Sequence, residues 1–315
     1  MLERFADYVV YNLFNIAQGT HLGDAISFFI YDSLKILILL SFMIFVISYI
    51  RSYFPPEKAR ELLSGKKLFV GNVIASILGV ISPFCSCSTV PIFIGFVEAG
   101  IPLGVTFSFL ITSPIVNEIA LAMLFTIFGW KIAGLYLISG MVIGIVGGII
   151  LGQMDLKHLV EEYVYQIEMG DTEVEEMTHQ QRYEFAKEAV GDIVKKIWIY
   201  VLVGIGIGAL VHGYAPGDLL VKYAGEGNPF AVLVAVVLGI PLYSNAAGTI
   251  PIIEALIGKG VPVGTALSFM MAVVALSVPE MVILRKVIKP KLITIFVGIV
   301  GTSIILVGYL FNIVL

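Results

Sequence analysis

The sequence predicts an all-α, polytopic integral membrane protein made of two homologous halves. Of its 315 residues, 58% are hydrophobic and 13% charged, whereas soluble proteins carry about a quarter charged residues. Long apolar stretches recur along the chain, and two of them are interrupted by proline and small polar residues. A set of residues also recurs at an offset of 160 positions. Most of the chain is therefore expected to have lipid as its solvent.

Residues 1–23 predict an amphipathic helix that lies at the membrane interface. Glu3, Arg4 and Asp7 are interspersed among apolar residues. A cleaved signal would instead need a basic stretch, an uncharged apolar core and a small-residue cleavage site.

Membrane-spanning helices need about 20 mostly apolar residues. Six stretches are expected to span the membrane: residues 26–50, 103–128, 132–151, 197–211, 263–284 and 292–315.

Two further apolar segments, residues 68–99 and 229–257, are broken in the middle, so that neither half is long enough to cross alone. Pro83 and Pro91 flank the first break, and Pro241 and Pro251 flank the second. Proline removes a backbone donor and disfavours helix for the residue before it. Each segment is therefore expected to unwind at mid-membrane, where unsatisfied backbone groups are tolerated only if protein or a water-filled cavity meets them.

An internal repeat of 160 residues relates the two halves, residues 24–152 and 192–315. Eight of 21 aligned positions are identical without a gap. The matched residues in the first half are Thr89, Pro91, Ile92, Gly100, Pro102, Gly104, Ser108 and Phe109. The linker, residues 153–191, is acidic and expected to be largely helical.

The basic residues orient the chain, because Lys and Arg in short loops stay on the cytoplasmic side. Basic clusters lie at residues 51–67 and 285–291, so both loops are expected to be cytoplasmic. If the broken segments are re-entrant hairpins, the linker is also cytoplasmic and the halves are inverted. If each broken segment crosses once, the linker is outside and the halves are parallel. Lys195 and Lys196 beside the linker favour the inverted arrangement.

Cys85 and Cys87 are the candidate ligands at the first break. Residues i and i+2 lie about 200° apart on a helix, so only an unwound backbone could turn both sulfurs to one ligand. A helix N-terminus after Cys87 would favour the thiolate, which binds soft metals and metalloids. The alternative is that both are small buried apolar side chains.

The second break carries hydroxyl and amide groups where the first carries thiols, which predicts an asymmetric site with two helix N-termini directed at it. The candidate substrate-binding residues are Cys85, Ser86, Cys87, Ser88, Thr89, Asn117, Tyr243, Ser244, Asn245 and Thr249.

Two carboxyl groups are candidates for coupling transport to protons. Glu118 lies well inside a predicted span, where an ionisable residue is a functional candidate. A neutral Glu118 bonded between helices is the alternative. Glu280 is the second candidate, although it could reach the interface near Arg285.

Several functions lack support in the sequence. The four histidines have no metal-ligand spacing, no nucleophile, base and acid can be assembled, and no phosphate-binding loop is present. We therefore expect neither an enzyme nor a cofactor, and nucleic acid is not an expected partner.

The motif Pro83-Phe-Cys-Ser-Cys-Ser-Thr-Val-Pro91, followed by Gly100-x-Pro-x-Gly104 and Thr112-Ser-Pro-x-x-Asn-Glu118, resembles the predicted permeases of the ArsP and YraQ type. The resemblance extends over the whole chain, and Cys-x-Cys between prolines is its most specific part. It implies a transporter of the cytoplasmic membrane, and relatives of this type export trivalent organoarsenicals through membrane cysteines. That role is carried over to Cys85 and Cys87 only.

The leading hypothesis is a multi-pass secondary permease that exports a soft metalloid or metal species, with protons as a possible coupling ion and rocking of the halves as the transport motion. A membrane thiol–disulfide oxidoreductase with a thioredoxin-like partner is one alternative. A channel, a partner subunit or a homo-oligomer are others.

Overall fold

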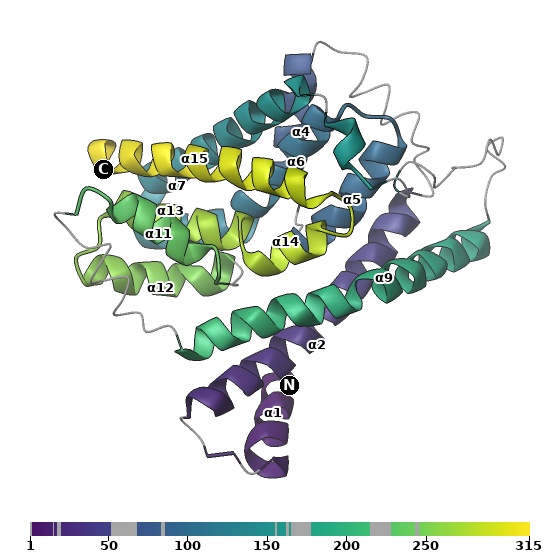
Figure 1. The fold of residues 1–315 in the computed structure, drawn as a ribbon, viewed down its shortest axis with the longest axis horizontal. Helices are drawn as coiled ribbons and strands as arrows, with labels where there is room; N and C mark the ends of the chain where they lie inside the picture. The colour runs from purple at the N-terminus through teal and green to yellow at the C-terminus, as the bar shows by residue number, and fades with distance from the viewer. Residues whose placement is uncertain are drawn as a thin grey trace.

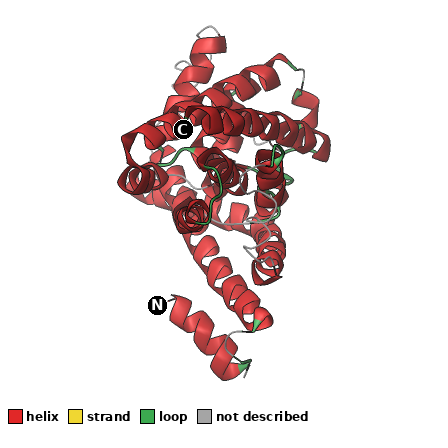
Figure 2. Cartoon of the chain, turned by 90° about the vertical axis from the view of Figure 1, so that its left-hand side faces the viewer, coloured by secondary structure: helices red, strands yellow, loops and turns green. Residues whose placement is uncertain are grey.

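The computed structural model describes residues 2–14, 16–17, 20–51, 68–82, 86–154, 156–161, 164, 178–214, 228–242 and 246–315. Within these ranges the regular structure is helical (Figure 2), and the extended pairing is confined to an isolated bridge between Val160 and Ile288. The prediction of an all-helical membrane protein is confirmed.

The N-terminal segment contains α1 (Leu2–Asp7) and η1 (Tyr8–Leu13), and the first half contains α2 (His21–Arg51), α4 (Leu68–Ile81), α5 (Ser86–Glu98), α6 (Leu103–Ile115) and α7 (Glu118–Gln153). The linker contains η2 (Lys157–Leu159) and the start of α9 (His179–Tyr214). The second half contains the rest of α9, α11 (Ala231–Gly239), α12 (Ala246–Gly258), α13 (Val263–Ala275), α14 (Val278–Leu284) and α15 (Pro290–Val314).

The helix boundaries recur along the chain. Both α5 and α6 begin and end 160 positions before α12 and α13. The turn that joins each of these pairs carries a glycine with positive φ, Gly100 at 71° and Gly260 at 89°. Glycine adopts this conformation without steric cost, and Pro102 or Pro262 then leads into the next helix.

Small residues bring α6 close to α7 in an antiparallel pair. A Cβ on Gly104 would lie 2.6 Å from the carbonyl oxygen of Gly148, and one on Gly148 would overlap the Ser108 hydroxyl. The packing of α13 on α15 is similar, with Gly264 against Gly308 and Ser268 beside Gly308. Small residues allow such approaches where lipid provides no hydrophobic drive for helix association.

The contacts define two opposite ends of the molecule. At the first, which we call face 1, Gly104 meets Gly152, and residues 157–161 pair with residues 285–289. At the second, face 2, the Lys131 ammonium lies 3.5 Å from the carbonyl oxygen of Val314. Helix α6 therefore starts at face 1 and α13 starts at face 2, and each ends in the interior.

The first broken segment doubles back on itself. Helix α4 runs parallel to α6, since Asn72 accepts a hydrogen bond from Ser108 at 2.7 Å and Ser82 lies 3.3 Å from Ser113. Helix α5 runs antiparallel to α6, to which it is joined by the turn at Gly100, and Phe93 packs against Phe107. Helices α4 and α5 thus run in opposite directions.

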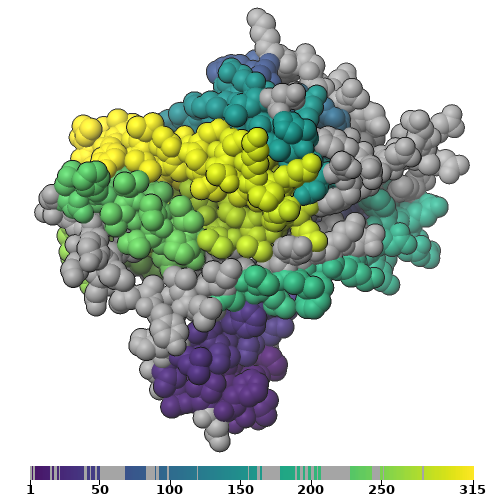
Figure 3. Space-filling view, in the orientation of Figure 1, coloured from purple at the N-terminus to yellow at the C-terminus, as the bar shows by residue number. Residues whose placement is uncertain are grey.

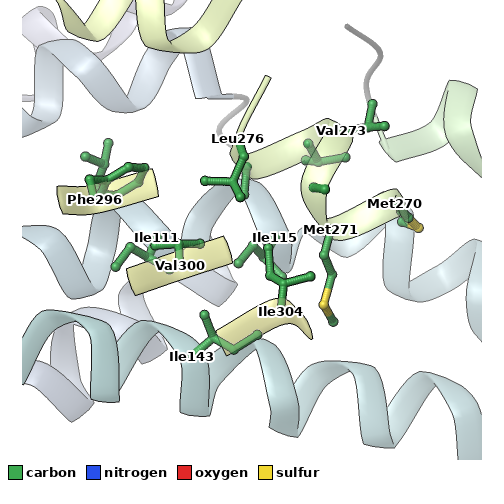
Figure 4. Close-up of a cluster of buried hydrophobic side chains, with 14 of the residues drawn as sticks. Ile111, Ile115, Ile143, Met270, Met271, Val273, Leu276, Phe296, Val300 and Ile304 are labelled. Carbon is green, nitrogen blue, oxygen red and sulfur yellow. The ribbon is translucent and has the colours of Figure 1, made fainter. Parts of the chain in front are cut away.

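A continuous apolar core joins α6, α7, α13 and α15 (Figure 4). Ile111 and Ile115 of α6 belong to the same buried cluster as Met271, Leu276 and Val300 of the second half. Because this core contains side chains from both halves, the two halves form one packed body (Figures 1 and 3).

Three helical segments are long and apolar enough to cross a membrane: Ala120–Gln153, Val263–Leu284 and Pro290–Val314. The first bends sharply at Gly129, where φ is 81°. A straight helix of its 34 residues would be about 51 Å long, well beyond the ~30 Å hydrocarbon core. The reversal at Gly129 divides it into a short helix and a complete span.

Outside this body, α2 and α9 form a long antiparallel pair (Figure 1). Tyr49 contacts His179 at 3.2 Å, and the Phe45 ring meets Tyr183 edge-on. Helix α9 begins at His179, so the end of the predicted linker is the first part of this helix. At the other end of α2, Ser27 donates a hydrogen bond to Asp7 and anchors α1.

Candidate functional site

The first helix of each broken segment, α4 or α11, ends in the interior of the protein, close to the interior end of α6 or α13. In the first, Ser82 donates a hydrogen bond to the carbonyl of Gly79 and lies beside Ser113 of α6. In the second, the Val278 amide donates to the carbonyl of Ile240 at 2.8 Å. The segments are therefore attached to α6 and to the α13–α14 connection, respectively.

A break also separates α6 from α7, within what the sequence predicts as one span over residues 103–128. Asn117 has an extended conformation, and its side-chain oxygen accepts a hydrogen bond from the Ala120 amide at 2.7 Å. This N-cap begins a new helix. Pro114 precedes the break inside α6. The break was not predicted because apolar length alone does not reveal a cap.

Tyr136 satisfies the backbone at this break. Its hydroxyl donates to the carbonyl oxygen of Ile115 at 2.9 Å, and its side chain is fully buried. The last carbonyls of a helix lack intrahelical donors, so this bond replaces one that α6 cannot make. The residue 160 positions later is Phe296, which is also buried but has no hydroxyl.

The break lies near the middle of the membrane-spanning body. Val116 packs against Gly140, which is ten residues along α7 from Trp130 near face 2. At 1.5 Å per residue this places the break about 15 Å from that face. Half of a typical hydrocarbon core has the same thickness.

Part of the predicted substrate site lies outside the described residues, namely Pro83, Cys85, Tyr243, Ser244 and Asn245. For another part the helical backbone is described but the side chains are not: Ser86, Cys87, Ser88, Pro91 and Pro251. Helix α5 begins at Ser86, so its N-terminus lies before Cys87 and not after it as expected from the sequence. Pro241 lies in the turn after α11. The thiol geometry therefore stays a prediction.

Thr89 and Thr249 are related by the 160-residue offset and have the same environment. Both are fully buried, and each has interactions with other groups. Each lies one turn into its helix, α5 or α12. Their hydroxyls therefore lie inside the packed body of the protein.

The two candidate carboxyls differ in exposure. Glu118, in the first turn of α7, is exposed, whereas Glu280 of α14 is only 3% exposed. Helix α14 packs against α5, and α12 packs against α7. Glu280 is therefore on a helix that packs against α5, and Glu118 is on a helix that packs against α12.

A contact between the linker and the second half at face 1 was not predicted from the sequence. Arg285 forms an ion pair with Glu161 at 2.8 Å, and backbone hydrogen bonds join Glu161 to Val287 and Lys289 to Leu159. Opposite charges in the linker and in the basic loop are the only sequence signal for it. Within the described residues, no group of three His, Cys, Asp or Glu side chains could hold a metal ion.

Comparisons with known proteins point to one family. The family model named ArsP_1, described as a predicted permease, matches residues 21–313. A Streptococcus mutans protein is 26% identical over 83% of this chain and 85% of its own length, and its name proposes it as a two-component membrane permease complex subunit. The UPF0718 protein YraQ of Escherichia coli K12 is 22% identical over 78% of this chain and 68% of its own. No solved structure matches.

Proposed function

The chain belongs to the predicted permease family of the ArsP type, and on that premise we propose that it is a secondary-active permease that exports a soft, thiophilic solute. The substrate class that fits best is a trivalent organoarsenical or a related metalloid or metal species, and the membrane is the cytoplasmic membrane. One observation supports the proposal most: helices that start at both faces are interrupted near the middle of the membrane-spanning body.

We propose that the halves, residues 24–152 and 192–315, are inverted repeats with re-entrant segments. The opposite directions of α4 and α5 support a hairpin that enters and leaves at face 1. The contact of Tyr309 with Pro229 and that of Gly239 with α13 support the same path from face 2. Inverted repeats that meet at discontinuous helices are common in secondary transporters.

Face 1 is then the cytoplasmic side. It carries Lys157 and the basic residues from Arg285 to Lys291, and positive residues in short loops stay in the cytoplasm. The acidic linker, residues 153–191, lies on the same side.

The Cys85 and Cys87 thiols would bind the solute covalently. For a monosubstituted arsenical, two arsenic–oxygen bonds break and two arsenic–sulfur bonds form, and each thiol proton leaves in a water molecule. Two thiols satisfy such a species, because its third valence is already taken by the organic group. The N-terminus of α5, which begins at Ser86, would favour thiolate at Cys87.

A carboxyl group on a half-helix would carry the coupling proton. Glu280 is buried beside α5 and Glu118 is exposed beside α12. Ionisable groups inside a membrane are costly and mark ion pathways.

Transport in everted membrane vesicles tests the function. Uptake of methylarsenite is measured for the unchanged protein, Cys85→Ser and Cys87→Ser, with and without a pH gradient. We expect uptake that needs both thiols and collapses with the gradient. If all three proteins match empty vesicles, the organoarsenical assignment is wrong.

A second candidate function is a subunit of a two-component permease, which the name of the Streptococcus mutans relative suggests. The full-length chain, purified alone and reconstituted in proteoliposomes, separates the two. Transport by the single chain supports an autonomous permease. Activity that appears only with a co-purified second protein supports the complex.

A further inference from the structure

The α2–α9 pair is placed asymmetrically on a nearly symmetric body. An offset of 160 residues maps His21–Arg51 onto residues 181–211, which lie within α9. The same offset relates α5 to α12 and the first part of α7 to α14. In a symmetric arrangement, a contact of α9 with α14 would be accompanied by an equal contact of α2 with α7. A contact of α2 with α5 would likewise be accompanied by one of α9 with α12.

The structure contains one set of these contacts. Helix α9 packs along α14, and α2 packs against α5. Among the described residues, neither α2 with α7 nor α9 with α12 makes a contact of comparable extent. Among the described residues, the pair therefore covers the half-helices that lead from the interior to face 1 more extensively than those that lead to face 2.

The two carboxyls follow this asymmetry. Glu280, on the covered half-helix α14, is 3% exposed. Glu118, at the start of the uncovered half-helix, is exposed at a depth of about 15 Å. A carboxylate that faced hydrocarbon at this depth would be strongly penalised. Exposure of Glu118 at mid-membrane therefore favours contact with water.

We infer that the α2–α9 pair is the gate of an alternating-access cycle and that this structure is the state open to face 2. In this state water reaches Glu118 from face 2, while α9 closes the path from Glu280 to face 1. In the other state the pair packs on α7 and α12, exposing the Glu280 end and covering Glu118. The inference rests on the proposed inverted repeats and transport activity.

The body formed by α6, α7, α13 and α15 would stay rigid during this motion. Its core joins both halves, and Lys131 with Val314 links them at face 2. Rocking of one half against the other would break these contacts. Movement of the α2–α9 pair would leave the contacts among α6, α7, α13 and α15 in place and break those that Ile36, Ile44 and Ile205 make with this core.

Two-sided thiol labelling tests which face reaches Glu118. Both native cysteines are replaced by serine, and Glu118→Cys or its symmetry-related control Val278→Cys is introduced. A membrane-impermeant maleimide is applied to intact cells or to everted vesicles. We expect Glu118→Cys to react at least about tenfold faster from face 2, because only a hydrated thiol ionises readily. Val278→Cys should be protected from both sides.

Labelling of Glu118→Cys from face 1, its failure to react from either side, or equal labelling of Val278→Cys would overturn the inference. Because the assay contains no transport substrate, a wrong substrate assignment would leave its result unchanged.

A bulky residue on the exposed side of α7, next to Glu118, tests whether the α2–α9 pair moves onto this helix. Ala122 is exposed on α7, one turn after Glu118, so Ala122→Trp fits this state but blocks the pair from packing there. We expect two results from two backgrounds. In the background without native cysteines, Ala122→Trp should leave Glu118→Cys reactive from face 2. With Cys85, Cys87 and Glu118 unchanged, it should give a folded protein that loses at least about tenfold in transport rate. Val142→Trp, on an exposed lipid-facing position of α7, is the matched control and should transport normally. Normal transport by Ala122→Trp would show that α2 never packs on α7.

Discussion

Tyr136 is the residue on which the break between α6 and α7 depends most directly. Its buried hydroxyl donates to the Ile115 carbonyl, and no backbone amide of α6 can replace it. The corresponding aromatic in the second half, Phe296, fills the same kind of space without the hydrogen bond. The two breaks are therefore held by different contacts.

Replacing Tyr136 with Phe should destabilise the protein by about 1–2 kcal/mol, because a buried carbonyl loses its donor while the packing is kept. Thermal unfolding of the purified protein in detergent measures the change. Tyr309→Phe is the matched control, since that hydroxyl also donates to a backbone carbonyl but from an exposed side chain. Equal effects of the two substitutions would show that burial at the break adds nothing.

The same residues show what the sequence could and could not predict about the site. Pro83 and Pro241 were expected to mark the breaks, since proline disfavours the helix interior, and α4 and α11 end just before them. Pro91 and Pro251, which were expected to flank the breaks, lie inside α5 and α12. The cap at Asn117 and the bond from Tyr136 depend on which side chains meet across helices, and spacing along one helix does not reveal that. Glu280 is likewise buried on α14, which packs against α9 and α5, both distant in sequence.

At the scale of elements, helix contacts are set by glycines that face a neighbouring backbone. Gly148 and Gly134 both lie in the same straight part of α7. A Cβ at Gly148 would overlap Ser108 and crowd the Gly104 carbonyl, whereas a Cβ at Gly134 meets nothing within 4 Å. Alanine at Gly148 therefore tests the effect of close packing between helices, and alanine at Gly134 tests the effect of helix propensity alone.

Gly148→Ala should destabilise the protein by about 1–3 kcal/mol, since α6 must move away from α7. Gly134→Ala should be neutral or stabilising by up to about 1 kcal/mol, the ordinary gain in helix propensity. Unfolding of both variants in the same detergent gives the comparison. A destabilised Gly134→Ala would mean that this face is covered by a partner in the membrane.

The helix bounds expected from the sequence agree with the structure to different degrees. The predicted span 263–284 matches a segment that is long and apolar enough to cross, but it is divided into α13 and α14 by a break at Leu276 and Ser277. The last predicted span begins within two residues of the start of α15. The linker was expected to be largely helical, and its last part, from His179, is the start of α9. Those residues pack against the end of α2 through Tyr49 and Phe45, so a tertiary contact extends the helix beyond its apolar part.

At the scale of the whole molecule, the two halves share one core and differ in how α2 and α9 cover them. Face 1 closes through the paired segments at Glu161 and Arg285, and face 2 brings the start of the α7 span to the end of α15. If the halves are inverted, the same structural unit is exposed to the cytoplasm in one half and to the exterior in the other. A transporter uses this property to present one site to either side.

The side of the membrane on which Lys131 and Lys157 lie tests the inverted arrangement of the halves most directly. In a background without native cysteines, Lys131→Cys and Lys157→Cys are labelled with an impermeant maleimide in intact cells and in everted vesicles. Both side chains are exposed, and Lys259→Cys, which lies outside in either arrangement, calibrates the preparation. Inverted halves with re-entrant segments predict that Lys131→Cys reacts only in intact cells and Lys157→Cys only in everted vesicles. The reverse pattern would mean that each broken segment crosses the membrane once and that the halves are parallel.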